Sequence, residues 1–188
     1  MGKTMKLFTI AVLFICTTMF NQNLLAAPPD ELPTENQYGG YLGPDIKITE
    51  LNGEINSLIG IKGGLLIQET LLLGGAVYGS LDDVEGTDDI LGYGGLYIDY
   101  FIGDPSDNRY SFNILIGAGR LDDPDDDDNE DAFLVIEPGI STQLYINQHT
   151  RLNIGLSYRL VRGSDYVTIS DSDLSGVSIG LNLNFGKF

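Results

Sequence analysis

The sequence of 188 residues predicts an all-β fold, an eight-stranded antiparallel up-and-down transmembrane β-barrel. Eight segments alternate apolar and polar residues with a period of two, which is typical of strands with one apolar face. In the last segment, residues 177–188, the opposite face holds only serine, glycine and asparagine up to the final lysine, too little carbon for half of a soluble core. Apart from one tight turn at Asn52-Gly53, the connections alternate between short links and longer acidic stretches, as in transmembrane barrels.

The chain begins with a segment that resembles a secretory signal peptide, residues 1–26. Lys3 and Lys6 supply the positive start, an apolar run follows, and Leu24-Leu25-Ala26 offers a processing site. The single cysteine, Cys16, lies in this segment, so the processed chain is expected to carry neither a disulfide nor a lipid anchor. The alternative, a retained membrane anchor, needs a longer apolar run. Residues 27–37 are polar and rich in proline and are expected to form a lead-in without structure of its own.

The first two strands form a predicted hairpin, residues 38–51 and 55–67. Asn52-Gly53 lies between them, and this pair strongly favours a two-residue type I′ turn. The turn places Ile46 opposite Ile59, so the apolar faces of both strands point to the same side. A slip of one residue would destroy this agreement.

The remaining strands continue with their apolar faces on the same side. Because the number of strands is even, both chain ends are expected at the same rim of the barrel. They are expected at residues 71–81, 90–102, 110–120, 132–146, 152–162 and 177–188. The short links at that rim are residues 68–70, 103–109 and 147–151, and the longer acidic connections at the other are 82–89, 121–131 and 163–176. An aromatic girdle is expected at the short-turn rim from Tyr38, Tyr100, Tyr110, Phe112 and Phe185, and at the other from Tyr78, Phe133 and Tyr158.

In strand number and pattern, residues 38–188 resemble the small eight-stranded outer-membrane β-barrel proteins of Gram-negative bacteria. The resemblance implies a monomer in the outer membrane with N- and C-termini in the periplasm, so that residues 27–37 become a periplasmic lead-in. It also implies contact with outer-membrane lipid and lipopolysaccharide, and recognition by the barrel assembly machinery. In that family a terminal Phe in step with the outward face aids recognition, whereas Phe188 is out of step here.

Six charged residues lie on the inward faces of the predicted strands. They are Asp45, Lys47, Lys62, Asp99, Glu137 and Arg159. An eight-stranded barrel is filled by its own side chains, and a buried charge without a partner is strongly destabilising. Three acids and three bases balance, which predicts an interior salt-bridge network that holds the barrel. A proton or ion path through the lumen is the functional alternative.

The most acidic connection has oxygen-bearing residues at alternate positions. They are Asp123, Asp125, Asp127, Asn129 and Asp131. Hard cations such as Ca²⁺ bind several converging oxygens, so this connection is a candidate Ca²⁺ site. The glycine and the closing glutamate of an EF-hand loop are missing, and a solvated acidic loop is the other interpretation. No other cofactor is expected.

The sequence favours a function that is not enzymatic. A formal net charge of −17 argues against nucleic acid as a partner. Some barrels of the family that this chain resembles modify lipids with a His, a Ser and an acid near the outer rim. The only histidine of this chain, His149, is expected in a short turn at the opposite rim. We therefore expect a structural or surface-interaction role for a barrel with a filled interior and acidic extracellular loops. The alternatives are a lipid-modifying outer-membrane enzyme and a secreted soluble barrel that binds a small apolar ligand.

Overall fold

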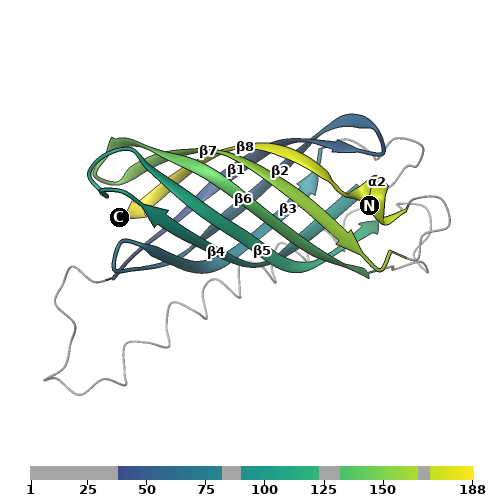
Figure 1. Ribbon diagram of the computed structural model, residues 1–188, viewed down its shortest axis with the longest axis horizontal. Helices are drawn as coiled ribbons and strands as arrows, with labels where there is room; N and C mark the ends of the chain where they lie inside the picture. Colours follow the sequence, from purple (N-terminus) through teal and green to yellow (C-terminus); the bar gives the residue numbers. More distant parts are fainter. Residues whose placement is uncertain (1–37, 82–89, 123–131, 165–169) are drawn as a thin grey trace, which may run out of the picture. The chain divides into compact units, whose positions relative to one another are not determined.

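The computed structural model describes residues 38–81, 90–122, 132–164 and 170–188, which form one closed β-barrel (Figure 1). Consecutive strands pair antiparallel in chain order, and the last strand closes the barrel against the first. This confirms the predicted eight-stranded up-and-down fold. The expected signal peptide and lead-in, residues 1–37, and the candidate Ca²⁺ ligands at 123–131 lie outside the described residues.

Each predicted strand is present, with bounds that differ from the expected ones by one or two residues at most. The strands are β1 Tyr38–Leu51, β2 Glu54–Ile67, β3 Leu71–Ser80, β4 Ile90–Ile102, β5 Arg109–Asp122, β6 Ala132–Asn147, β7 Thr150–Arg162 and β8 Gly176–Lys187. A four-residue helix, α2 Asp171–Leu174, precedes β8 and was not predicted. None of the helical residues described in the structure forms a segment long and apolar enough to cross a membrane.

The β1–β2 hairpin has the predicted turn and register. Asn52 and Gly53 have φ values of 50° and 83°, the left-handed conformation that a type I′ turn requires at both positions. Ile46 lies opposite Ile59, and Asp45 lies opposite Gly60. The local turn therefore sets which residues of β1 and β2 point into the barrel.

Pairs of glycines allow neighbouring strands to approach closely on the inward side. Gly64 pairs with Gly74, and a Cβ added to Gly64 would lie 2.5 Å from the Cα of Gly74. Gly95 and Gly117 form a similar pair between β4 and β5. The bare backbone at these positions leaves room inside the barrel for bulky inward side chains.

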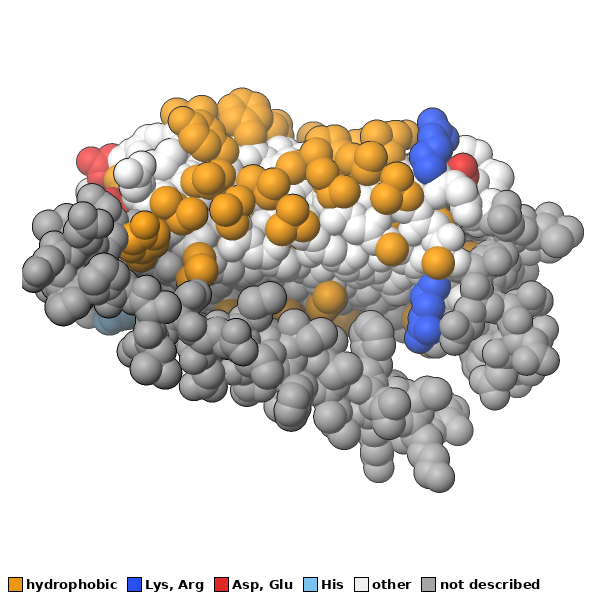
Figure 2. All heavy atoms as spheres, turned by 90° about the horizontal axis from the view of Figure 1, so that it is seen from below, with side chains coloured by type: hydrophobic (Ala, Val, Ile, Leu, Met, Phe, Trp, Pro, Cys, Tyr) orange, Lys and Arg blue, Asp and Glu red, His pale blue; other side chains and the backbone are white. Residues whose placement is uncertain are grey.

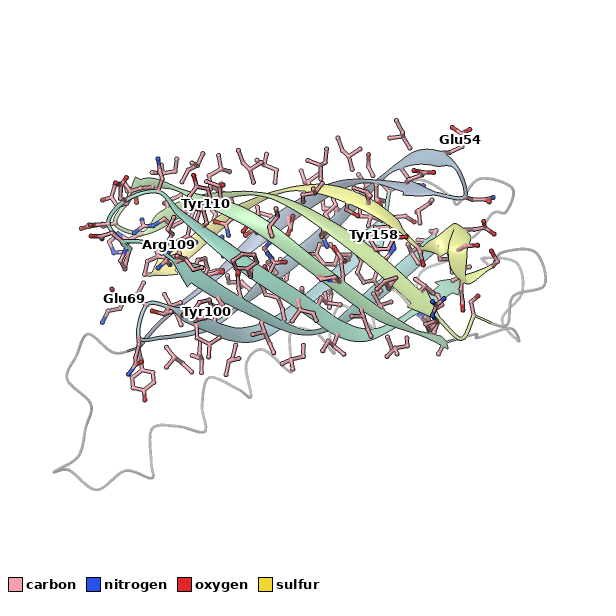
Figure 3. All side chains as sticks on the ribbon, viewed as in Figure 1. Glu54, Glu69, Tyr100, Arg109, Tyr110 and Tyr158 are labelled. Carbon is pink, nitrogen blue, oxygen red and sulfur yellow. The ribbon has the colours of Figure 1, made fainter. Side chains whose placement is uncertain are left out.

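The outward faces carry an apolar band around the barrel, part of which is visible in Figure 2. Near the middle of their strands, Ile46, Ile116 and Leu156 expose between 43% and 49% of their surface. The aromatic residues expected at the short-turn rim are all exposed: Tyr38, Tyr100, Tyr110, Phe112 and Phe185. Figure 3 shows Tyr100 and Tyr110 near that end of the barrel.

The aromatic girdle predicted for the opposite rim is wrong at two of its three positions. Tyr78 and Phe133 are 5% and 2% exposed and lie inside the barrel, whereas Tyr158 faces outward. The reason is the period of two: Leu134 is outward and exposed, so its neighbour Phe133 must be inward. Tyr78 is inward for the same reason, because its neighbour Val77 lies on the outward face of β3.

Candidate functional site

The centre of the barrel interior holds a buried ion pair between β1 and β6. Lys47 Nζ lies 2.6 Å from Glu137 Oε1, and the two side chains are 8% and 2% exposed. Tyr93 donates a hydrogen bond to the other carboxylate oxygen at 2.9 Å, and Ser157 donates to Oε1 at 2.5 Å. Three donors therefore surround this carboxylate, which offsets the cost of its burial.

A second buried ion pair joins β1 and β2. Lys62 Nζ lies 3.0 Å from Asp45 Oδ2, and the hydroxyl of Tyr78 donates to the same oxygen at 3.0 Å. The hairpin register explains the contact, because Lys62 is diagonal to Asp45 on the inward face.

Tyr78 connects the two ion pairs. The ammonium of Lys47 lies 3.6 Å from the centre of the Tyr78 ring, and Tyr78 stacks on Tyr93 with 5.1 Å between ring centres. Alternation on β3 places the ring inside, but its partners come from β1 and β4. The sequence signal that could have identified Tyr78 is its inward parity next to outward Val77 on β3.

The other two predicted charges, Asp99 and Arg159, are fully buried but belong to neither ion pair. Asp99 accepts a hydrogen bond from Tyr97 at 3.2 Å. Arg159 Nε donates to the carbonyl of Leu174 at 2.7 Å, which ties β7 to α2. Within the described part of the chain, neither charge lies within 4.0 Å of an opposite charge. Of the six predicted charges, four therefore form two ion pairs and two are held by hydrogen bonds.

Two further buried cations lie near the short-turn rim and were not among the predicted site residues. Arg109 is 1% exposed and lies inside the barrel at the same end as Glu69 (Figure 3). Its Nε donates to Gln143 at 2.8 Å, its Nη1 donates to the carbonyl of Glu69 at 2.5 Å, and its guanidinium lies 4.0 Å from the Phe101 ring centre.

Arg151 is 4% exposed and contacts the other two short turns. It donates to the carbonyl of Pro105 at 3.1 Å and to that of Asn147, and its guanidinium lies 4.5 Å from the ring centre of Phe188. The two arginines thus connect all three short turns. Both were assigned to connections in the sequence because β5 and β7 begin one or two residues earlier than the alternation indicates.

Phe188, which is out of step with the outward face of β8, packs at the end of the barrel. Its ring stacks on Tyr41 with 5.3 Å between centres and an interplanar angle of 25°. The outward aromatic position at this end of β8 is taken by Phe185, which is 51% exposed. The terminal Phe188 is therefore out of step because it packs on Tyr41, while Phe185 occupies the outward position.

An interior cavity of about 30 Å³ lies beside the two ion pairs, with Asp45, Lys62, Glu137 and Asn153 among its lining residues. A polar cavity needs roughly 10–15 Å³ to hold a water molecule, so this one has room for water and little else. It is too small for the apolar ligand of a lipocalin-like protein.

The described residues show no constellation that resembles a catalytic or metal centre. His149 is exposed in the β6–β7 turn, where its backbone N–H donates to Asn147 Oδ1 at 2.9 Å and its carbonyl accepts from Gly186 at 3.0 Å. No three His, Cys, Asp or Glu side chains among these residues gather to hold a metal ion.

Two carboxylates outside the strands stabilise the rims. The hydroxyl and backbone N–H of Ser106 donate to Asp104 at 2.6 and 2.8 Å and lower the pKa of this carboxyl group. The hydroxyl and backbone N–H of Ser170 lower the pKa of Asp173 in the same way and cap α2. Both groups are therefore charged at neutral pH, when their hydrogen bonds hold the local turn.

Comparison with known proteins finds similar folds among solved structures and no match by sequence. No protein-family model matches the chain, and no curated protein matches its sequence. Solved structures do match. The N-terminal β-barrel domain of OprF from Pseudomonas aeruginosa has a TM-score of 0.54 at 12% identity and covers 78% of this chain and 96% of its own.

Two further structures are similar to the same extent. Neisserial surface protein A has a TM-score of 0.56 at 12% identity, with 80% of this chain and 96% of its own covered. The attachment invasion locus protein Ail of Yersinia pestis has a TM-score of 0.52 at 10% identity, with 81% and 99% covered. The chain therefore has the fold of the small eight-stranded outer-membrane β-barrels, which confirms the resemblance in pattern and strand number.

Proposed function

We propose that this chain is a non-enzymatic outer-membrane β-barrel with a structural or surface-interaction role. The observation that carries the proposal is the distribution of side chains: aliphatic residues are exposed outside the closed barrel while charged residues are buried inside it. A water-soluble barrel would reverse this arrangement, because exposed apolar surface favours transfer into hydrocarbon.

The two rims support one orientation in the membrane. The short turns after β2, β4 and β6 suit the periplasmic side, and the longer connections after β3, β5 and β7 suit the outside. This orientation puts both chain ends in the periplasm, where the barrel assembly machinery would receive the chain. The acidic connections would then meet cations such as Ca²⁺, lipopolysaccharide or another cell. The candidate cation ligands are Asp123, Asp125, Asp127, Asn129 and Asp131.

The interior supports a filled barrel without an open pore. Inward side chains form two ion pairs at mid-height, and apolar residues pack toward the ends, among them Leu66, Leu72, Leu121 and Val161. The names of two proteins with the same fold, a surface protein and an attachment invasion locus protein, agree with a role at the cell surface. At 10–12% identity they support the fold of this chain and only suggest its role.

The orientation of the outward face is testable with two matched arginine substitutions. Leu156 lies at the middle of β7 and Ile146 at the end of β6, and both are outward and about half exposed. In a membrane, Leu156→Arg places a charge in hydrocarbon at a cost of about 2–4 kcal/mol, while Ile146→Arg lies near the interface at about 0–1 kcal/mol. We expect only Leu156→Arg to reduce the folded fraction.

Membrane fractionation combined with heat-modifiable gel mobility measures this difference. The proposal expects the parent chain and the Ile146→Arg variant in the outer-membrane fraction with a mobility that heating changes. A chain found in the soluble fraction, or a Leu156→Arg variant that folds as well as the Ile146→Arg variant, would reject the membrane orientation.

A further inference from the structure

The charged side chains inside the barrel do not balance. Five cationic side chains are buried, Lys47, Lys62, Arg109, Arg151 and Arg159, against three carboxylates, Asp45, Asp99 and Glu137. The surplus arises from Arg109 and Arg151. In the described part of the chain neither guanidinium forms an ion pair, and their hydrogen bonds go to carbonyl and amide oxygens, which carry no net charge.

The same region contains buried donor atoms without partners. Among the residues that the structure describes, five of these atoms are Tyr41 Oη, Arg109 Nη2, Gln143 Nε2, Arg151 Nε and Asn184 Nδ2, and the acceptor Asn184 Oδ1 also lacks a partner. We call these five residues the turn-side donor layer. Each is 4% exposed or less. Buried donors of this kind are expected to have an acceptor, because leaving them unpaired is destabilising.

The fold brings the members of the turn-side donor layer together. Arg109 lies opposite Gln143 in the β5–β6 pair, and Arg151 lies opposite Asn184 in the β7–β8 pair. Tyr41 and Arg151 contact the same ring, that of Phe188. Gln143 in turn lies opposite Asn153, the next inward residue after Arg151 on β7, so the two arginines occupy neighbouring parts of the same rim.

Aromatic rings fix both guanidiniums in place. Arg109 lies on Phe101, and Arg151 lies 4.4 Å from the ring centre of Tyr145 as well as on Phe188. Carbonyls of the short turns accept from Arg109 Nη1 and from both Nη atoms of Arg151, and Gln143 Oε1 accepts from Arg109 Nε. Donors that are already oriented lose little freedom when a ligand binds, which favours affinity for a small acceptor.

We propose that the turn-side donor layer binds a small inorganic anion of chloride size. Such an ion accepts several hydrogen bonds at once and neutralises part of the surplus positive charge, whereas water satisfies the donors but leaves the charge uncompensated. The site is separate from the proposed role at the cell surface and does not depend on it.

Halide dependence of stability tests the site. The chain without its predicted signal peptide is folded in uncharged detergent micelles. It is then heated at constant ionic strength in buffers in which gluconate is replaced stepwise by chloride. We expect the thermal midpoint to rise by about 3 °C or more on going to roughly 0.3 M chloride, because the ion binds the folded state. Bromide is expected to act like chloride and to give an anomalous scattering peak within the layer in a crystal.

Matched arginine variants separate this site from a general salt effect. Arg151→Gln removes a charge from the layer and is expected to abolish the halide dependence, whereas Arg162→Gln, at the exposed end of the same strand, is expected to preserve it. Equal midpoints of the parent chain in chloride and gluconate, or a bromide peak elsewhere, would overturn the proposal, and neither result requires the variant to fold. Halide dependence retained in a folded Arg151→Gln variant would overturn it as well.

Discussion

Lys47 and Glu137 form a buried ion pair in a barrel interior that already contains more cations than carboxylates. Removing one member of such a pair typically costs about 3–5 kcal/mol of folding free energy. Glu137→Leu would leave five buried cations facing two carboxylates, so we expect a loss in that range. Lys47→Met would bring the charges closer to balance, and Glu137 would still accept hydrogen bonds from Tyr93 and Ser157, so we expect a smaller loss.

Urea unfolding in micelles measures the free energies of the two single variants and of the double variant. The double variant replaces both charges by apolar groups and is expected to be more stable than Glu137→Leu alone. Equal losses for the two single variants would show that the surplus of positive charge has no influence on stability.

The period of two identified the inward face but could not identify contacts across the lumen. Asp45 and Lys62 are neighbours in one hairpin, so their proximity follows from the register of a single turn. Lys47 and Glu137 are 90 residues apart and meet across the interior, which depends on the strand tilt and stagger of the whole barrel. The two arginines at the short turns were missed because β5 and β7 extend into the predicted links.

The backbones of β2 and β3 approach so closely where Gly64 pairs with Gly74 that there is no room for a side chain at either position. A Cβ at Gly64 would lie 2.5 Å from Gly74 Cα, a backbone atom that cannot move without separating the strands. At Gly180, also inward, the nearest atoms are Lys47 Cγ at 3.5 Å and Asp45 Oδ1 at 3.6 Å, an ordinary contact. We therefore expect Gly64→Ala to destabilise the barrel by about 1–3 kcal/mol and Gly180→Ala to be tolerated.

The same urea titration compares these two alanine variants. Both replace an inward glycine by the same residue, so they differ mainly in the space available on the partner strand. If both variants had the parent midpoint, the close approach of β2 and β3 would not be required for folding.

Elements held by local interactions were predictable, and those held by tertiary contacts were not. The Asn52-Gly53 turn and the alternation of the strands each follow from a few neighbouring residues. The four-residue helix α2 is too short to be stable on its own. It is held by buried Leu174, by Arg159 at the carbonyl of Leu174, and by the N–H of Asn52, which donates to Asp173 at 2.8 Å.

For the molecule as a whole, alternation and loop lengths predicted the closed barrel, because an apolar outer face and a polar inner face admit few architectures. The partner could not be predicted in the same way. Recognition outside the membrane would fall to the longer connections, whose acidic composition indicates a charge and does not define the shape of a binding surface.

Ion conduction distinguishes a filled barrel from a pore. The described interior contains a cavity of about 30 Å³, while Leu174 is buried at one end and Arg109 and Arg151 connect the turns at the other. A continuous ion path would need water along the full length of the lumen, and an eight-stranded barrel has little room for it. We expect no steady single-channel current when the folded chain is inserted into a planar bilayer, with Arg162→Gln as a control that leaves the interior unchanged. A steady current from the parent chain, sustained at constant voltage, would show that the interior is open to water.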